Sequence, residues 1–367
     1  MPFKAFPDKQ EESTTTTTTS SMDIIEDELT MLTDDPKSWH GSSLLDAKQI
    51  TGPGLRLLFK VASSMRGLVR DDGGDDRLRN HVINTIFYEA STRTSCSFQA
   101  AIKRLGGSNL HVDGKGNSAA GKKGESLEDT VRCLECYSDV TILRHPQQGS
   151  VGKVVGMARK PVINAGDGVG EHPTQALLDV FTIHDELKLY QYKVKPHLTV
   201  TILGDNKNGR TVHSLAKTLC ACRKVLWTNT LTIRYCTPAG LEMPEYVVKY
   251  VDKFADEGVT QETVYTIDEA IENANVLYVT RIQKERFATE EEYHAVKGSY
   301  VVDEEVMARA PENMIVCHPL PRVDEIKPEV DKDRRAAYFR QMENGMFVRM
   351  ALLVLVLGKS RVMYEKY

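Results

Sequence analysis

The sequence predicts an α/β protein with two doubly wound domains, each built on a central parallel sheet that is flanked by helices. Three observations indicate this fold class. The length of 367 residues suits two domains at roughly 100–200 residues each. Short apolar, β-branched runs alternate with helical patterns through both halves of the chain, as expected for buried parallel strands. The apolar pattern near the C-terminus is long enough for a helix that crosses back to the first domain.

The first half of the chain is predicted to hold four strands. Each is a run rich in Val, Ile and Leu that ends at polar or turn residues, which is typical of a buried strand. These runs lie at residues 82–87, 109–112, 139–146 and 161–168. Helical patterns precede, separate and follow them at residues 50–69, 97–107, 125–138 and 173–188. The last of these carries Pro173 in its first turn, where the fixed φ of proline suits a helix start.

The second half repeats the alternation. Its predicted strands lie at residues 198–205, 231–238, 275–281 and 314–322, and its predicted helices at residues 210–222, 244–258, 267–274 and 336–358. The helix at 173–188 stands between the two sets of strands and can bridge them. We therefore expect a first domain at residues 39–178, completed by the terminal helix at about 340–367, and a second domain at residues 179–339.

Residues 1–38 are expected to form a disordered tail. They contain the threonine run 14–19 among serines and acidic residues, and this composition cannot bury enough apolar surface to offset the entropy lost on ordering. No apolar stretch typical of a secretory signal is visible in this segment.

Composition and charge argue against several classes of protein. The formal net charge of −4 does not indicate electrostatic attraction to nucleic acid or to membrane surfaces. The longest apolar run, residues 350–357, is too short to span a bilayer. Seven scattered cysteines do not form a secreted disulfide framework. Cys133 and Cys136 lie in a helical pattern without a second ligand pair, so buried or half-buried thiols are expected. We predict a cytoplasmic protein without nucleic-acid or membrane partners.

The motif Ser91-Thr92-Arg93-Thr94 joins the strand at 82–87 to the following helix. Free N–H groups at the helix N-terminus, small hydroxyls and one guanidinium could converge there on a phosphate dianion. Ser and Thr also begin ordinary helices, so the motif alone fits a capped helix with a surface arginine equally well. The glycine-rich loop at 113–126 adds the pair Lys122-Lys123, for which a solvated position is the simpler interpretation.

Other polar side chains follow neighbouring strands of the same predicted sheet. Arg144 ends the strand at 139–146, and His172 and Gln175 stand at the start of the helix at 173–188. Ligands of doubly wound sheets bind at the carboxyl ends of the strands. The convergence of Arg93, Arg144 and His172 at such ends therefore favours the phosphate site.

Two further arginines occupy equivalent places in the second half. Arg210 begins a helix and Arg281 follows a strand, so the chain offers four guanidiniums in all. Four are more than one phosphate needs, which indicates a second anionic ligand whose carboxylates are held by bidentate pairs.

Motifs of other chemistries are missing from the sequence. There is no Walker A pattern, no GxGxxG after the first strand, no GxSxG and no HExxH. His145, His172 and His318 each lie next to or near proline in a turn, so no metal is expected and no cofactor is implied. What remains is a site that positions two anions and polarises a carbonyl through proximity and electrostatic preorganisation.

The chain resembles the aspartate transcarbamoylase family. The motifs FYEASTRTSCSF, KKGES, ILRHP, NAGDGVGEHPTQALLD, GDNKNGRTVHSL, YVTRIQKERF, HPLPRVDEI and AAYFRQMENGMF recur in the family's order from about residue 40 to 358. The version found as a domain of the eukaryotic multifunctional pyrimidine protein is the most similar. The resemblance implies carbamoyl transfer from carbamoyl phosphate to the amine of L-aspartate in pyrimidine synthesis, in a homotrimer whose active sites lie at subunit interfaces.

The resemblance also implies a role for each matching residue. The carbamoyl phosphate contacts would be Ser91, Thr92, Arg93, Thr94, Arg144, His172 and Gln175, joined by Lys123 from the neighbouring subunit. Of these, the catalytic residues would be Arg93, Thr94, Arg144, His172 and Lys123. The aspartate contacts would be Arg210, Arg281, Gln283 and Lys123, and the backbone at Leu320 and Pro321 would contact the reacting groups. Glu89 and Arg286 would support the arginines through ion pairs.

The chain departs from the family at one site position, and two rival interpretations stay open. Aligned without gaps, Ala119 stands where the family carries an interface serine, with Ala120 beside it; Ser118 could replace that serine if the loop is longer by a residue or two. Ala119 leaves room for a catalytically silent trimeric scaffold that binds carbamoyl phosphate. An ornithine-type transcarbamoylase shares the STRT and HPTQ motifs of the phosphate site, but two arginines on the acceptor side would repel cationic ornithine.

Overall fold

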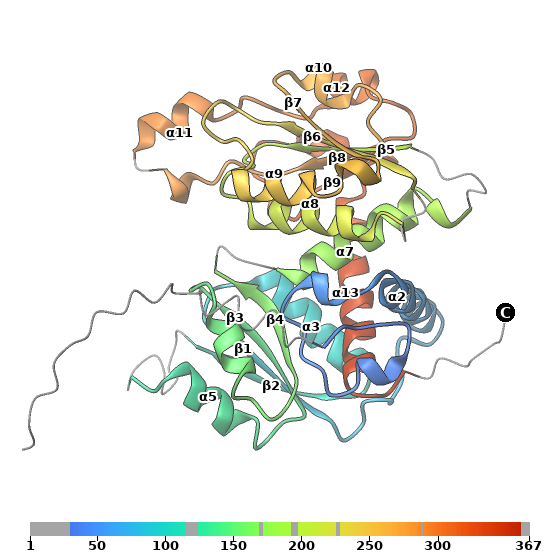
Figure 1. Ribbon diagram of the computed structural model, residues 1–367, viewed down its shortest axis with the longest axis vertical. Helices are drawn as coiled ribbons and strands as arrows, with labels where there is room; N and C mark the ends of the chain where they lie inside the picture. The colour runs from blue at the N-terminus through green and yellow to red at the C-terminus, as the bar shows by residue number, and fades with distance from the viewer. Residues whose placement is uncertain are drawn as a thin grey trace, which may run out of the picture.

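A computed structural model describes residues 30–114, 124–168, 172–191, 197–224, 228–287 and 289–360. These residues form two lobes, each with its own sheet, as Figure 1 shows. The lower lobe of Figure 1 contains η1 Pro36–Ser38, η2 Ala47–Gln49, α2 Gly52–Asp72, β1 Val82–Phe87, α3 Thr92–Arg104, β2 Ser108–Asp113, α5 Leu127–Leu134, β3 Val140–His145, α6 Ser150–Val155 and β4 Val162–Asp167.

Helix α7, Pro173–Glu186, leads from the first lobe to the second. The chain continues through η3 Leu189–Gln191, β5 His197–Leu203, α8 Arg210–Cys222, β6 Thr230–Cys236, α9 Glu245–Asp252, η4 Ala255–Glu257, β7 Val259–Val264, α10 Ile267–Ile271, β8 Val276–Val279, η5 Lys284–Arg286, α11 Glu290–Val296, α12 Glu304–Arg309, β9 Ile315–Cys317, η6 Pro328–Lys332 and α13 Tyr338–Val356.

Both sheets are parallel, and both are doubly wound. Across the described residues the strand order is β2-β1-β3-β4 in the first sheet and β7-β6-β5-β8-β9 in the second. The order reverses direction between β1 and β3 and again between β5 and β8. Ligands of such sheets bind beyond the carboxyl ends of the strands at these reversals. The predicted fold class is confirmed, and each sheet has one place suited to a ligand.

Helix α13 returns the chain to the first lobe, as the apolar terminal pattern predicts. It packs against α2, α3 and α7, and it lies beside α2 and below α7 in Figure 1. Its residues Phe347, Leu352 and Leu353 are fully buried. A Cβ added at Gly345 would lie 2.9 Å from the Leu178 Cδ2 atom, so the close approach of α13 to α7 leaves little room for a side chain at this position.

Two expectations about the N-terminal lobe are wrong in part. Residues 30–38 pack onto the body instead of belonging to the tail: Leu32 is buried and pairs with Ile50, and the Trp39 indole donates a 2.7 Å hydrogen bond to the Thr33 carbonyl oxygen. Residues 1–29 lie outside the described residues. Cys133 near the end of α5, Leu127–Leu134, and Cys136 just beyond that helix are both exposed, not buried or half-buried as expected.

Several elements differ from their predicted extent. Helix α3 begins at Thr92, five residues earlier than the apolar pattern suggests, so the Thr92-Arg93-Thr94 segment forms its first turn. The strand Val259–Val264 is not predicted because it lies at the sheet edge, where only Val259 is buried and no apolar run is needed. None of the helices in the described ranges is both long enough and apolar enough to cross a membrane.

Candidate active site

One cavity of about 860 Å³ collects the predicted site residues from both lobes. Its lining residues come from the carboxyl end of β3 and from segments that follow β1, β4, β5, β8 and β9, so the strands on either side of both order reversals contribute. The predicted residues that line it are Ser91, Thr92, Arg93, Thr94, Arg144, His172, Gln175, Arg210, Arg281, Gln283, Leu320 and Pro321. Lys123 and the alternative residues 118–120 lie outside the described residues.

The N-terminus of α3 forms one wall of the cavity. Ser91 is the residue before the helix, and its side chain makes no capping hydrogen bond to the described residues. The first N–H groups of any helix lack partners within the helix, so this wall offers hydrogen-bond donors and a positive dipole end. Burial lowers the pKa of Arg93 below its ordinary value, and the nearby guanidinium of Arg281 lowers it further. The charges of Arg93 and Arg281 therefore face a shared space.

Glu89 joins the arginines of the two lobes. Its Oε2 atom lies 2.8 Å from Arg144 Nη2 and 3.2 Å from Arg210 Nη2. Arg210 also donates to the carbonyl oxygen of Gly168. Burial raises the pKa of the Glu89 carboxyl, but the two guanidiniums outweigh burial and bring it below its ordinary value. The prediction that Glu89 supports the arginines through ion pairs is confirmed.

His172 lies beside Arg144 and is held in its neutral form. Arg144 Nη1 is 3.5 Å from His172 Nε2, and His172 is buried at the N-cap of α7. Burial, together with the positive charges of Arg144, Arg210 and Arg349, lowers the pKa of His172 well below its ordinary value. Its buried Nδ1 atom has no hydrogen-bond partner among the described residues. A neutral imidazole here can donate one hydrogen bond without adding charge.

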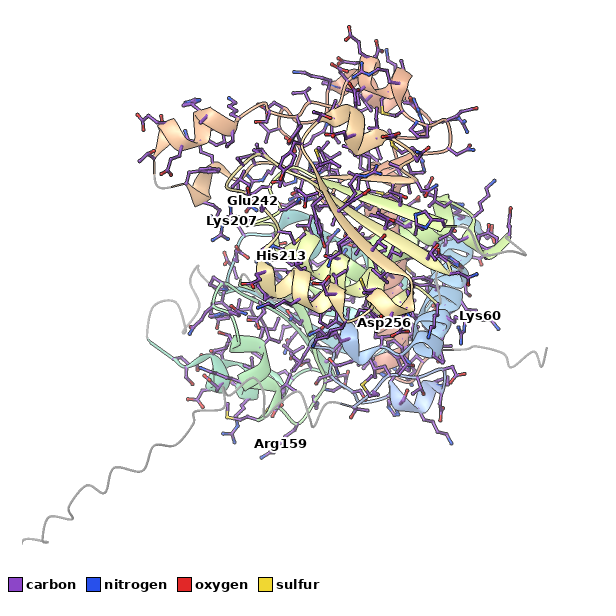
Figure 2. The ribbon with its side chains drawn as sticks, turned by 45° about the horizontal axis from the view of Figure 1, so that its top comes forward. Lys60, Arg159, Lys207, His213, Glu242 and Asp256 are labelled. Atoms are coloured by element: carbon purple, nitrogen blue, oxygen red, sulfur yellow. The ribbon has the colours of Figure 1, made fainter. Side chains whose placement is uncertain are left out.

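The loop before α8, residues 204–209, is held by hydrogen bonds of His213, and this loop positions Arg210 at the start of the helix. His213 on α8 lies 2.7 Å from the Asn206 carbonyl oxygen through Nε2 and 2.9 Å from the Tyr246 hydroxyl through Nδ1. Figure 2 shows His213 near Lys207, which belongs to the same loop. Gln283, which follows β8 of the same sheet, also holds this loop, because its Nε2 donates a 3.1 Å hydrogen bond to the Asn208 carbonyl oxygen.

The turn after β9 forms the remaining wall. His318 Nδ1 accepts a 2.8 Å hydrogen bond from the Leu320 N–H, and His318 Nε2 lies 2.7 Å from Glu325 Oε1. Leu320 has φ of 54° and precedes Pro321 through a cis peptide bond. Burial lowers the pKa of His318 despite the Glu325 carboxylate. The imidazole therefore accepts at Nδ1 and donates at Nε2, which holds the turn against the cavity.

Arg349 lines the cavity but is not among the residues predicted from the sequence. It projects from α13, donates a 2.9 Å hydrogen bond to Ser97 Oγ, and lies 5.1 Å from the centre of the Phe98 ring. Burial lowers its pKa to about 10. The signal in the sequence is an arginine within the apolar run 346–357, where a charge has no place unless it faces a polar site.

The cavity carries a large excess of positive charge. Among the described residues that line it, six are arginines and two are glutamates. The arginines are Arg93, Arg144, Arg210, Arg281, Arg286 and Arg349, and the glutamates are Glu89 and Glu343. Such a site binds ligands that carry several negative charges, and it stabilises negative charge that develops during a reaction.

Two family models match consecutive parts of the chain. Residues 42–185 match the carbamoyl-phosphate-binding domain of the aspartate/ornithine carbamoyltransferases, and residues 197–356 match their aspartate/ornithine-binding domain. The chain therefore belongs to the aspartate/ornithine carbamoyltransferase family.

Similar proteins fall into long and short forms. The multifunctional protein pyr1-3 of Dictyostelium discoideum is 50% identical over 318 residues, which are 87% of this chain and 14% of that protein. The chain thus spans about one seventh of the multifunctional relatives that it matches. The aspartate carbamoyltransferase catalytic subunit of Thermococcus kodakarensis is 44% identical over 320 residues, which are 87% of this chain and 98% of that protein.

Solved structures show the same fold at a similar level of identity. Aspartate transcarbamoylase from Trypanosoma cruzi in complex with N-(phosphonacetyl)-L-aspartic acid is 41% identical, covers 87% of this chain and 97% of its own, and has a TM-score of 0.79. The complex of the same enzyme with carbamoyl phosphate has a TM-score of 0.80 with the same identity and coverage.

Proposed function

We propose that this chain is an aspartate carbamoyltransferase, which transfers the carbamoyl group of carbamoyl phosphate to the amine of L-aspartate and releases phosphate. The product is N-carbamoyl-L-aspartate, formed in the second step of pyrimidine synthesis. The observation that carries the proposal is the convergence of Arg93, Arg144, Arg210 and Arg281 on one cavity. One phosphate and two carboxylates supply the matching negative charge.

The phosphate group of carbamoyl phosphate would bind at the first turn of α3. Ser91, Thr92 and Thr94 offer hydroxyls there, the helix start offers N–H groups, and Arg93 offers its guanidinium. Lys123 would complete the cradle from a neighbouring subunit. A dianion at this place would also relieve the mutual repulsion of Arg93 and Arg281.

The carbamoyl group would lie against Arg144 and His172. The neutral amine of aspartate attacks the carbonyl carbon, and the new C–N bond moves negative charge onto the carbonyl oxygen. Arg144, His172 and Thr94 would stabilise that oxygen, and a neutral His172 can donate to it without losing a proton. The C–O bond to phosphate then breaks, and the departing phosphate takes the amine proton, so no protein base is required.

The carboxylates of aspartate would pair with Arg210 and Arg281. Gln283 supports this side, because it already holds the loop before α8. The backbone at Leu320 and Pro321 would contact the amine and the carbamoyl group from the opposite wall. Cationic ornithine would meet two guanidiniums in the same place, so we expect the enzyme to reject it.

We also infer a cytoplasmic homotrimer with shared active sites. The family resemblance and the expected contribution of Lys123 from a second subunit support this assembly. A catalytically silent trimer that binds carbamoyl phosphate is the second candidate, favoured only by Ala119 in place of the family's interface serine.

Steady-state carbamoylation with L-aspartate or L-ornithine as acceptor tests the proposal. We expect N-carbamoyl-L-aspartate with aspartate and no product with ornithine. Turnover of ornithine would contradict the roles of Arg210 and Arg281. Tight binding of a bisubstrate analogue without turnover of either acceptor would favour the silent trimer, and Ala119→Ser would then be the variant to make.

A further inference from the structure

A buried carboxylate lies directly behind the cavity. Asp179 follows Gln175 by one turn of α7, and its exposed fraction is 0%. Its Oδ1 accepts hydrogen bonds from Gln175 Nε2 at 2.9 Å and from Gln341 Nε2 at 2.6 Å. Its Oδ2 accepts a 2.7 Å hydrogen bond from the Tyr278 hydroxyl. The three donors come from α7, α13 and β8, so one side chain joins three elements and both lobes.

The network continues from Asp179 to the turn after β9. Gln341 Oε1 accepts a 2.9 Å hydrogen bond from the His318 N–H. His318 Nδ1 accepts in turn from the Leu320 N–H. A continuous chain of hydrogen bonds, buried as far as His318 and partly buried at Leu320, therefore runs from the Gln175 amide to the backbone of the turn that carries Leu320 and Pro321.

This network decides how two glutamine amides are oriented. In its ionised form, the Asp179 carboxylate can only accept hydrogen bonds, so it binds the nitrogen of each amide and not its oxygen. The oxygen of Gln341 is consequently directed at His318. The oxygen of Gln175, a residue that lines the cavity, remains as the acceptor for an N–H group of a ligand. The NH2 of a carbamoyl group is such a donor.

We propose that Asp179 is a positioning residue for carbamoyl transfer, which fixes the amide of Gln175 and, through Gln341, the His318–Pro321 turn in one mutual geometry. The proposal rests on the proposed function, because Gln175 and the turn matter only if a carbamoyl group reacts between them. Asp179 is too deeply buried to touch substrate, so it acts through these neighbours.

Geometry and charge at this position can be separated by substitution. In Asp179→Asn, the amide oxygen can accept from both glutamines, and the amide nitrogen can donate to the Tyr278 oxygen after its hydroxyl rotates. The network then survives without the negative charge. In Asp179→Ala, three buried donors lose their acceptor, and the Gln175 amide is free to turn over.

We would measure kcat for Asp179→Ala, Asp179→Asn and Gln341→Ala, with inhibition by inorganic phosphate as an internal control. Misplacing reacting groups by about 1 Å lowers rates roughly 10- to 100-fold, so we expect a loss of this size in Asp179→Ala and a smaller one in Gln341→Ala. Asp179→Asn should recover most of the rate. Phosphate inhibition should stay unchanged in all three, because phosphate alone engages the α3 side.

Asn344→Ala is the matched control. Asn344 Nδ2 donates a 3.1 Å hydrogen bond to Thr182 Oγ1 across the same α7–α13 contact, one turn away from Asp179 and without connection to Gln175 or His318. Its loss disturbs the packing of these helices but not the amide orientation, so kcat should stay near that of the wild type.

The outcomes separate the inference from the proposed function. Wild-type kcat in Asp179→Ala or Gln341→Ala would overturn the positioning role, as would equal losses in the Asn and Ala variants at position 179. Removing Gln341 in the Asp179→Ala background should have no further effect, and additive losses would contradict the linked network. A wild-type protein that forms no carbamoyl-aspartate would instead overturn the proposed function and the inference together.

Discussion

At the scale of single residues, the contacts of Glu89 show how one carboxylate can hold two arginines of the site in place. A single oxygen of this carboxylate holds Arg144 from the first lobe and Arg210 from the second. Arg144 is almost fully buried, and without a partner its charge would be costly in that position. The pair therefore fixes the spacing between the guanidinium expected to face the carbamoyl oxygen and the one expected to face aspartate.

The substitution Glu89→Gln tests this arrangement. The side chain of Glu89 is 32% exposed, so solvent screens its ion pairs with Arg144 and Arg210. We therefore expect the free energy of unfolding to fall by roughly 1–3 kcal/mol. The rate of carbamoyl transfer should fall about 10-fold or more, since both arginines lose their fixed positions. Urea unfolding and steady-state kinetics measure the two effects. Glu312→Gln is the control, because Glu312 pairs with Arg334 on the surface; equal effects of both substitutions would contradict the prediction.

Much of the site can be predicted from the sequence, because its residues directly follow recognisable strands. The segment Ser91–Thr94, Arg144, Arg210 and Arg281 all stand where a short apolar run ends or a helix begins, and the parallel topology brings such places together. The Asp179 network cannot be predicted in this way. Asp179 and Gln341 are separated by 162 positions, and neither lies in a local pattern that indicates the other.

At the scale of elements, the C-terminal helix α13 helps to form the site in the first lobe. This helix belongs to the end of the chain, yet it packs on α2, α3 and α7 of the first lobe and contributes Arg349 to the cavity. Its strong apolar pattern makes it predictable. The edge strand β7 and the short helices α6, α11 and α12 are not, because each spans only six or seven residues and buries at most three of them, which is too few to define a period.

Two glycine-to-alanine substitutions should have opposite effects on stability. Gly67 lies within α2 and has open space where a Cβ would be placed, so Gly67→Ala should raise the free energy of unfolding by about 0.5–1 kcal/mol through helix propensity. In Gly345→Ala the new Cβ would lie 2.9 Å from Leu178 Cδ2 and 3.0 Å from Arg349 Nη1. Overpacking of roughly 1–3 kcal/mol exceeds the propensity gain, so we expect a net loss.

Thermal or urea unfolding of both variants checks this prediction. Gly345→Ala should also lower activity, because the displaced Arg349 lines the cavity, whereas Gly67→Ala should leave activity unchanged. A stabilised Gly345→Ala variant would mean that α7 and α13 can separate without loss, and that the glycine is not needed for their contact.

At the scale of the whole molecule, buried histidines should make the protein sensitive to mild acid. Burial lowers the pKa of His145, His172, His184 and His318, for His184 to about 4. In the unfolded chain each of these histidines binds a proton as pH falls through about 6.5, whereas in the native protein it binds one only at lower pH. The free energy of unfolding therefore falls as pH falls below about 7. Burial raises the pKa of Asp167 and Asp179, for Asp179 to about 7, so these two carboxyls oppose the four histidines with at most two protons and cannot reverse the sign.

His184→Gln isolates one of these contributions. His184 lies between the rings of Phe59 and Tyr190 and does not line the cavity, so activity should persist. A shift of this pKa from about 6.5 to about 4 implies that the variant loses about 1.3 kcal/mol less than the wild type between about pH 7.5 and about pH 5.5. Urea unfolding at the two pH values measures the difference. Parallel losses in both proteins would show that His184 does not contribute.

The proposed sharing of active sites makes a prediction about mixtures of inactive variants. Lys123→Ala and Arg93→Ala should each abolish most turnover alone, since the first removes the expected contribution of a neighbour and the second removes the phosphate contact of the chain itself. If subunits assemble at random into symmetric trimers, about one quarter of the sites in an equal mixture receive both wild-type residues. Co-expression of the two variants should therefore restore turnover to about one quarter of the wild-type value.

Arg93→Ala mixed with Arg144→Ala is the control: both residues line the same cavity of one chain, so every site stays defective and no turnover returns. Recovery in the first mixture alone would establish that Lys123 acts across an interface. An absence of recovery would mean that each chain completes its own site, and unchanged turnover in Lys123→Ala would remove this lysine from the catalytic residues altogether.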